Sequence, residues 1–150
     1  MIDNKKNIAI LGSTGSIGTQ ALEVIEANTD LFVVEVLSAN SNSSLLIKQA
    51  LKFRPNSVVI VDETKYQEVF DALSSQGIKV YAGKDALAQV VEMEDIDMVL
   101  TALVGYSGLK PTISAIKAKK NIALANKENL VVAGALITGL AKKNGVSIYP

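Results

Sequence analysis

Residues 12–18 read Gly-Ser-Thr-Gly-Ser-Ile-Gly, and they stand between an apolar run at 8–11 and an amphipathic stretch. This order predicts a strand, a turn and a helix. Because glycine has no Cβ, Gly12 can take a tight turn, Gly15 lets a ligand approach the backbone, and Gly18 lets the helix pack close to the strand. The N–H groups at the helix N-terminus, with their partial positive charge, can then hold a pyrophosphate. The predicted dinucleotide site comprises Gly12, Ser13, Thr14, Gly15, Ser16, Ile17 and Gly18.

The glycine spacing is G-x-x-G-x-x-G, whereas G-x-G-x-x-G is more common, so the pattern alone is moderately specific. The alternative is that these glycines only turn a strand into a helix in another kind of α/β protein. Strand, turn and helix follow one another in the order that nucleotide binding requires, which favours the binding site.

Composition limits the other classes of function. The chain has 150 residues, of which 49% are hydrophobic, so we expect one domain over residues 1–150 with one good core. Fifteen basic residues balance fifteen acidic ones, which does not favour a nucleic-acid partner. The chain lacks Cys and His, which removes disulfides, thiol nucleophiles, imidazole catalysis and the usual zinc sites.

The longest apolar stretch, at 130–140, is interrupted by Gly134 and Gly139 and is too short to span a bilayer. The N-terminal residues do not have the pattern of a signal peptide. We therefore expect a soluble cytoplasmic protein that does not bind membranes.

Apolar strands and amphipathic helices alternate along the whole chain. Strands are expected at 8–11, 31–37, 57–61, 79–81, 98–101, 121–124 and 146–149. Helices are expected at 16–27, 43–53, 64–75, 84–92, 109–119 and 131–143. This alternation predicts an α/β fold that is Rossmann-like and doubly wound, with a mainly parallel sheet and helices on both faces. The expected strand order is 3-2-1-4-5-6, with a short extra element after the third helix.

The end of the second strand indicates which dinucleotide binds. An Asp or Glu there would bind the ribose hydroxyls of NAD, but residues 37–44 read Leu-Ser-Ala-Asn-Ser-Asn-Ser-Ser. Glu35 comes about three residues too early, and we expect it at an edge or facing solvent. The absence of a carboxylate favours NADP over NAD. Alternatively, residues 40–44 only cap the next helix, a role that is compatible with phosphate binding.

Three segments together resemble one family. They are the glycine loop, the stretch Val-Gly-Tyr-Ser-Gly-Leu-Lys-Pro-Thr at 104–112, and Leu-Ala-Asn-Lys-Glu at 124–128. In this order they closely resemble the 1-deoxy-D-xylulose 5-phosphate reductoisomerase family, over about Asn7 to Pro150. Taken alone, Asn126 could be a helix cap, with Lys127 and Glu128 as solvated residues of a first helical turn.

The resemblance implies an NADPH-dependent oxidoreductase of the non-mevalonate route of isoprene biosynthesis. Such an enzyme rearranges 1-deoxy-D-xylulose 5-phosphate and reduces it to 2-C-methyl-D-erythritol 4-phosphate, with Mg or Mn as Lewis acid. It also implies a homodimer of the full-length protein. In the cofactor site, Thr14, Gly15, Ser16 and Ile17 would contact the pyrophosphate region, Asn40, Ser41 and Asn42 the adenosine ribose phosphate, and Asn126 and Glu128 the nicotinamide half. Lys127 would bind the sugar phosphate substrate.

The sequence departs from the family pattern at Ser41, where many members have Lys. The family's acidic metal ligands and phosphate-binding residues fall beyond the position that matches Pro150, so no metal ligand and no certain catalytic residue is expected among these residues. We expect the chain to bind NADPH without turning over substrate. Two alternatives remain: a regulatory nucleotide-sensing module, and another NADP-dependent enzyme such as a semialdehyde dehydrogenase.

Overall fold

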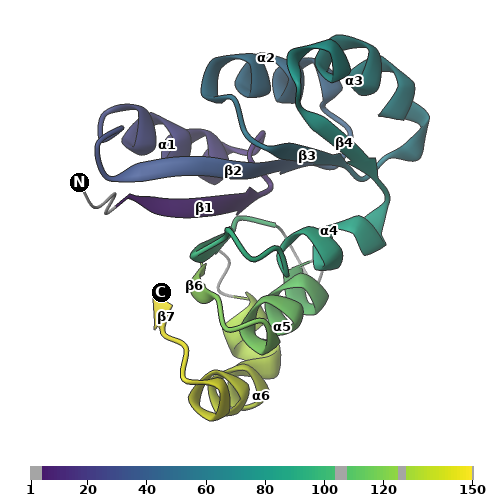
Figure 1. Cartoon of the computed structure of the whole chain (residues 1–150). Coiled ribbons are helices and arrows are strands. Elements are labelled where there is room, and N and C mark those ends of the chain that lie inside the picture. Colours follow the sequence, from purple (N-terminus) through teal and green to yellow (C-terminus); the bar gives the residue numbers. More distant parts are fainter. Residues whose placement is uncertain (1–4, 104–107, 125–127, 150) are drawn as a thin grey trace.

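A seven-stranded sheet with the order β4-β3-β2-β1-β5-β6-β7 forms the centre of the chain (Figure 1). The computed structural model describes residues 5–103, 108–124 and 128–149. Every neighbouring pair of strands is parallel. The strands are β1 (Lys6–Leu11), β2 (Phe32–Ala39), β3 (Ser57–Ile60), β4 (Lys79–Ala82), β5 (Met98–Thr101), β6 (Asn121–Leu124) and β7 (Ile148–Tyr149).

The observed strand order confirms the predicted doubly wound topology. The short extra element is β4, which extends the sheet beyond β3. When β4 is left out and the other six strands are numbered along the chain, their order is 3-2-1-4-5-6. The winding reverses at β1, whose two neighbours are β2 and β5. In sheets of this kind a ligand binds beyond the carboxyl ends of the strands at this reversal.

Helices cover both faces of the sheet (Figure 1). Buried residues of α1, α2 and α3 pack on one face, and those of α4, α5 and α6 pack on the other. These helices are α1 (Ser16–Glu26), α2 (Ser43–Phe53), α3 (Tyr66–Leu73), α4 (Lys84–Val90), α5 (Leu109–Lys117) and α6 (Glu128–Asn144), and two 3₁₀ turns, η1 (Glu63–Lys65) and η2 (Ser74–Gln76), flank α3. In the part of the chain that the structure describes, no helix is long and apolar enough to cross a membrane.

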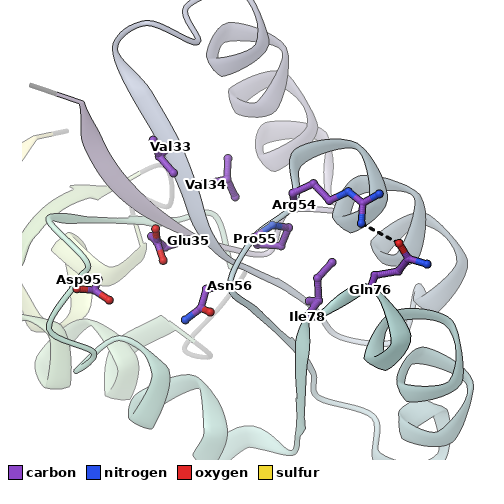
Figure 2. A pocket seen from close by; sticks show the side chains of 10 residues that line it. Val33, Val34, Glu35, Arg54, Pro55, Asn56, Gln76, Ile78 and Asp95 are labelled. Atoms are coloured by element: carbon purple, nitrogen blue, oxygen red, sulfur yellow. Dashed lines mark hydrogen bonds between the residues drawn. The ribbon is translucent and has the colours of Figure 1, made fainter. Parts of the chain in front are cut away.

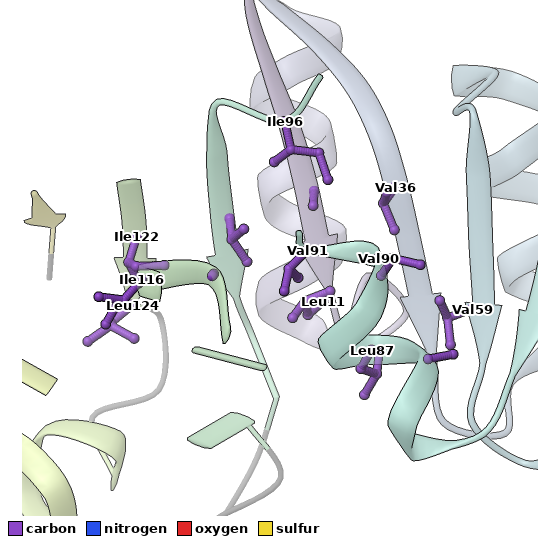
Figure 3. Close-up of a cluster of buried hydrophobic side chains, with 14 of the residues drawn as sticks. Leu11, Val36, Val59, Leu87, Val90, Val91, Ile96, Ile116, Ile122 and Leu124 are labelled. Atoms are coloured by element: carbon purple, nitrogen blue, oxygen red, sulfur yellow. The ribbon is translucent and has the colours of Figure 1, made fainter. Parts of the chain in front are cut away.

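Helices cover both faces of the sheet, which explains why apolar residues do not alternate with polar ones along the central strands. In β1, Ile8 and Ile10 face the α1 side, while Ala9 and Leu11 face the α4 side. Figure 3 shows the cluster on the α4 side, in which residues of the central strands meet the apolar side of α4 and residues of α5 and β6. Because both faces are covered, both sets of side chains in a central strand must be apolar.

Several element boundaries differ from the expectations by one or two residues, and the third helix, the last helix and the last strand also differ. The helix expected at 64–75 is divided, because the Asp62 carboxylate accepts a hydrogen bond from the Thr64 N–H at 3.0 Å and starts a 3₁₀ turn there. The last helix begins at Glu128, three residues before the expected start at Val131. An acidic residue is favourable in a first helical turn, so the segment after β6 becomes helix sooner than its apolar pattern indicates. The last strand is limited to Ile148–Tyr149.

Ser57 offers a test of the packing at the amino end of β3. Its side chain is fully buried, and its Oγ has no hydrogen-bond partner in the structure. A buried polar atom without a partner costs about 1–3 kcal/mol. We therefore expect Ser57→Ala to raise the free energy of unfolding, by up to about 1 kcal/mol once the small loss of packing is included. Urea denaturation measures this, and a lowered midpoint would contradict the expectation.

Candidate functional site

The glycine loop connects β1 to α1 at the carboxyl edge of the sheet, and two of its glycines are required by the geometry. Gly12 has φ +85°, and a Cβ on it would lie 2.9 Å from the carbonyl oxygen of Ala102. A Cβ on Gly18 would overlap the carbonyl oxygen of Gly12 and lie 2.6 Å from the Cα of Ser13. The tight turn at Gly12 and the close packing at Gly18 are thus confirmed, although Gly18 packs on the loop rather than on the strand itself.

Gly15 has a different environment. It is exposed, with φ −76° and ψ 174°, and the nearest atom to a Cβ there would be the Gly12 carbonyl oxygen at 3.8 Å. The fold therefore does not need a glycine at this position. Gly15 precedes α1, and within the described part of the chain no side chain caps this helix. The N–H groups of the first turn, at Ser16 and Ile17, begin a helix whose end is open toward solvent, which is the arrangement that binds anions.

Ser13 is the one residue of the loop whose side chain is fully buried. Its Oγ donates to Oε1 of Gln49 at 2.7 Å, and Nε2 of Gln49 donates to the Ser13 carbonyl oxygen at 2.9 Å. Ser38, at the end of β2, accepts the Ser13 N–H at 2.8 Å through its carbonyl oxygen and the Gly12 N–H at 2.9 Å through its Oγ. Sequence analysis missed Ser38 and Gln49, because neither belongs to the loop motif.

The segment of Asn40, Ser41 and Asn42 follows β2 directly, so the bonds to Ser38 bring it to the same edge as the glycine loop. All three residues are exposed. Oδ1 of Asn42 accepts the Leu45 N–H at 3.3 Å, which confirms that this residue caps α2. The assignment of the segment to an adenosine ribose phosphate stays a prediction.

Two acidic residues lie next to this segment, and neither of them is at the end of β2. The backbone N–H of Asp62 donates to the Asn40 carbonyl oxygen at 2.8 Å, and the Ser43 hydroxyl donates to Oε2 of Glu68 at 2.6 Å. Donation from the hydroxyl of Thr64, and then from its backbone N–H, lowers the pKa of the Asp62 carboxyl. The general rule that parallel strands end at one edge could have indicated Asp62, which comes soon after β3.

The remaining predicted site residues lie after β6. Asn126 and Lys127 fall outside the described residues, and Glu128 is the first residue of α6. Since β6 is parallel to β5 and β5 to β1, the segment that follows β6 starts at the same edge of the sheet as the glycine loop. The roles of these three residues stay predictions.

Glu35 lines a cavity of about 430 Å³ near the amino ends of β3 and β4. Figure 2 shows it with Asn56 and Asp95 at one end of this cavity, while Arg54 donates to Gln76 at the other. Burial, and then the charges of Asp95 and Asp97, raise the pKa of the Glu35 carboxyl. The expectation that Glu35 lies at an edge is wrong, because its strand lies between β1 and β3, and its side chain is half-buried.

The parallel sheet, the helices on both faces and the glycine loop at the reversal point define a Rossmann-like protein of the doubly wound α/β class. The model of the family described as 1-deoxy-D-xylulose 5-phosphate reductoisomerase matches residues 8–134, and the chain belongs to this family.

Individual relatives agree with this assignment. The 1-deoxy-D-xylulose 5-phosphate reductoisomerase of Bacteroides thetaiotaomicron is 62% identical over 148 residues, which cover 99% of this chain and 38% of the relative. The solved reductoisomerase of Zymomonas mobilis in complex with NADPH has a TM-score of 0.90 and 37% identity over 96% of this chain and 38% of its own. Another structure, a DOX-P reductoisomerase in complex with NADPH, fosmidomycin and magnesium, has a TM-score of 0.90 and 33% identity over 95% of this chain and 35% of its own.

The chain thus spans about 38% of the length of the curated relatives that it matches. Among the residues that the structure describes, no group of three or more Asp, Glu, His or Cys side chains could hold a metal ion. The donor set of the described residues therefore does not fit the magnesium of the solved relatives.

Proposed function

We propose that this chain is the NADPH-binding domain, residues 1–150, of a reductoisomerase that converts 1-deoxy-D-xylulose 5-phosphate to 2-C-methyl-D-erythritol 4-phosphate. The observation that carries the proposal is the start of α1: an uncapped helix N-terminus behind an exposed Gly15, at the edge where the winding reverses. Its N–H groups would donate to the pyrophosphate of the cofactor. Membership of the family supports NADPH as that cofactor.

The other predicted site residues would act together with this helix N-terminus. Thr14, Ser16 and Ile17 would surround the pyrophosphate with Gly15. Asn40, Ser41 and Asn42 would contact the adenosine ribose phosphate, and Asn126 and Glu128 the nicotinamide half. When bound, NADPH supplies the hydride for the reduction. Lys127 would hold the sugar phosphate substrate and stabilise negative charge that develops on its oxygen.

The charges around residues 40–42 make the choice between NADPH and NADH informative. Ser41 does not provide the cation of the usual family pattern. The backbone N–H of Asp62 donates to Asn40 within the segment, and the carboxylate of Glu68 accepts from Ser43 next to it. Exposed carboxylates near a 2′-phosphate weaken its binding only modestly, because water screens them. We therefore expect NADPH to bind more tightly than NADH, by a smaller factor than a Lys at position 41 would give.

Titration of the purified chain with NADPH and with NADH, followed by calorimetry, tests this proposal. One NADPH per chain with a lower Kd than NADH is expected, and saturable binding of neither nucleotide would contradict the cofactor role.

In a second assay, 1-deoxy-D-xylulose 5-phosphate and Mg²⁺ are added to the NADPH complex. We expect no steady oxidation of NADPH, and steady oxidation would refute the proposal that these residues bind cofactor without catalysing the reaction. Completing the enzyme, as a homodimer with Mg or Mn, would require the residues that the longer relatives have in addition.

A further inference from the structure

We infer that Gln49 of α2 is a positioning residue, which fixes the shape of the glycine loop from behind and thereby sets the affinity for the cofactor. This inference rests on the proposed binding of NADPH at the loop. Gln49 is 7% exposed and Ser13 is 0% exposed, and the Gln49 carboxamide contacts the loop at Ser13 from the side of α2. We therefore expect Gln49 to influence the cofactor through these hydrogen bonds to the loop.

The contact between the two residues has two points. The single carboxamide of Gln49 accepts from the Ser13 Oγ at 2.7 Å and donates to the Ser13 carbonyl oxygen at 2.9 Å. A primary amide has both an acceptor and a donor in one plane, and neither an apolar side chain nor an ionised carboxylate has both. The pair therefore fixes the Ser13 side chain and the peptide that joins it to Thr14.

Ser38 holds the same turn from the opposite side. Its Oγ accepts the Gly12 N–H at 2.9 Å, and its carbonyl oxygen accepts the Ser13 N–H at 2.8 Å. Ser38 of β2 thus holds the N–H groups of Gly12 and Ser13, and Gln49 of α2 holds the carbonyl oxygen of the peptide that joins Ser13 to Thr14. The segment from Thr14 to the first turn of α1 therefore starts in a fixed direction. A binding site gains affinity when its donors are already aimed before the ligand arrives.

Gln49 also connects the two predicted halves of the cofactor site. It belongs to the helix that begins directly after Asn42, and it contacts the loop that would hold the pyrophosphate. A rotation of α2 would therefore move the adenosine side and the loop together. The geometry predicts that removal of this amide loosens the loop while the sheet and the other helices stay intact.

The test compares Gln49→Leu with Leu73→Ala. Leu73 lies in α3, fully buried on the same face of the sheet, and it takes no part in the hydrogen bonds that join Gln49 and Ser38 to the loop. Its truncation therefore lowers stability without changing those bonds. Three quantities are measured for each variant: the Kd for NADPH, the melting temperature, and the deuterium exchange of the amides at 12–18 in the free protein.

For Gln49→Leu, which removes both hydrogen bonds to Ser13, we expect a Kd raised by about tenfold, or about 1.4 kcal/mol, and faster exchange at 12–18. For Leu73→Ala we expect a lower melting temperature with a Kd within about twofold of the original and unchanged loop exchange. Gln49→Glu keeps the volume and the acceptor and removes the donor to Ser13, and we expect it to weaken NADPH at least as much as Gln49→Leu.

The inference is overturned if the Gln49 variants leave the loop exchange unchanged, or if Leu73→Ala raises the Kd as much as they do. Should Gln49→Leu fail to fold, Gln49→Glu and Ser38→Ala are measured instead, with the same two readouts decisive. Should the original chain not bind NADPH, the proposed function fails. The positioning role is then decided by exchange alone: faster exchange at 12–18 in the Gln49 variants supports it, and equal rates refute it.

Discussion

Gly18→Ala is expected to lower the free energy of unfolding by about 3 kcal/mol, because the added methyl group has no space. It would overlap the Gly12 carbonyl oxygen and lie 2.6 Å from the Cα of Ser13. Both obstacles are backbone atoms, which cannot rotate away as a flexible side chain can. Relief requires that α1 move away from the loop, and the loop is held by Ser38 and Gln49. For a domain of this size, the melting temperature should fall by roughly 6–12 °C.

Gly139→Ala is the matched control for this experiment. Gly139 lies within α6, and a Cβ there would meet nothing within 4 Å. The same substitution should therefore raise stability by up to about 1 kcal/mol, through the higher helix propensity of alanine. Thermal denaturation of both variants separates the two effects. Equal stability of Gly18→Ala and Gly139→Ala would mean that α1 does not pack on the loop as the structure describes.

Local chemistry made much of this fold predictable. Helix α2 has the expected bounds, Ser43–Phe53, because a capping residue precedes it and Pro55 comes soon after it. The roles of Gly12 and Gly18 could be inferred from the order strand, turn, helix, since the positive φ of Gly12 belongs to the turn itself and Gly18 packs on Gly12 and Ser13, although the contact of Gly12 with Ala102 could not. The strand order could be inferred from the alternation together with the glycine loop after the first strand, because this loop indicates two mononucleotide-binding halves that meet there, and connections between parallel strands are right-handed and do not cross.

The contacts that complete the candidate site depend on residues far apart in the sequence. Gln49 meets Ser13 across 36 positions, and Ser38 meets it across 25. A Gln on a helix and a Ser in a strand are common, and no spacing rule connects them. The partial burial of Glu35 has the same origin, because it depends on Asp95 and Asn56, which reach β2 only through the folded sheet. Sequence patterns indicate the motif that meets the ligand more readily than the buried groups that support it.

Gly15→Val is expected to leave the fold intact and to weaken NADPH binding by at least about a hundredfold, or about 2.7 kcal/mol. The backbone at Gly15, with φ −76° and ψ 174°, is extended and suits a β-branched residue. A Cβ there would come no closer than 3.8 Å to a protein atom, so the added methyl groups project into the space beyond the helix N-terminus. That is the space which the pyrophosphate would occupy, and its oxygens could no longer reach the N–H groups of the first turn.

The measurement for Gly15→Val combines calorimetric titration with NADPH and thermal denaturation of the free protein. The melting temperature should change little, because a less favoured residue at a helix N-cap costs about 1 kcal/mol. For Gly18→Ala we expect instead a large loss of stability, which is measured even in the absence of ligand. If Gly15→Val bound NADPH as tightly as the original chain, the pyrophosphate could not lie over α1, and the proposed cofactor site would have to be placed elsewhere on the sheet edge. Loss of affinity in a stable variant would instead place the ligand directly against this helix end, because the exposed Gly15 has no packing role whose disruption could act at a distance.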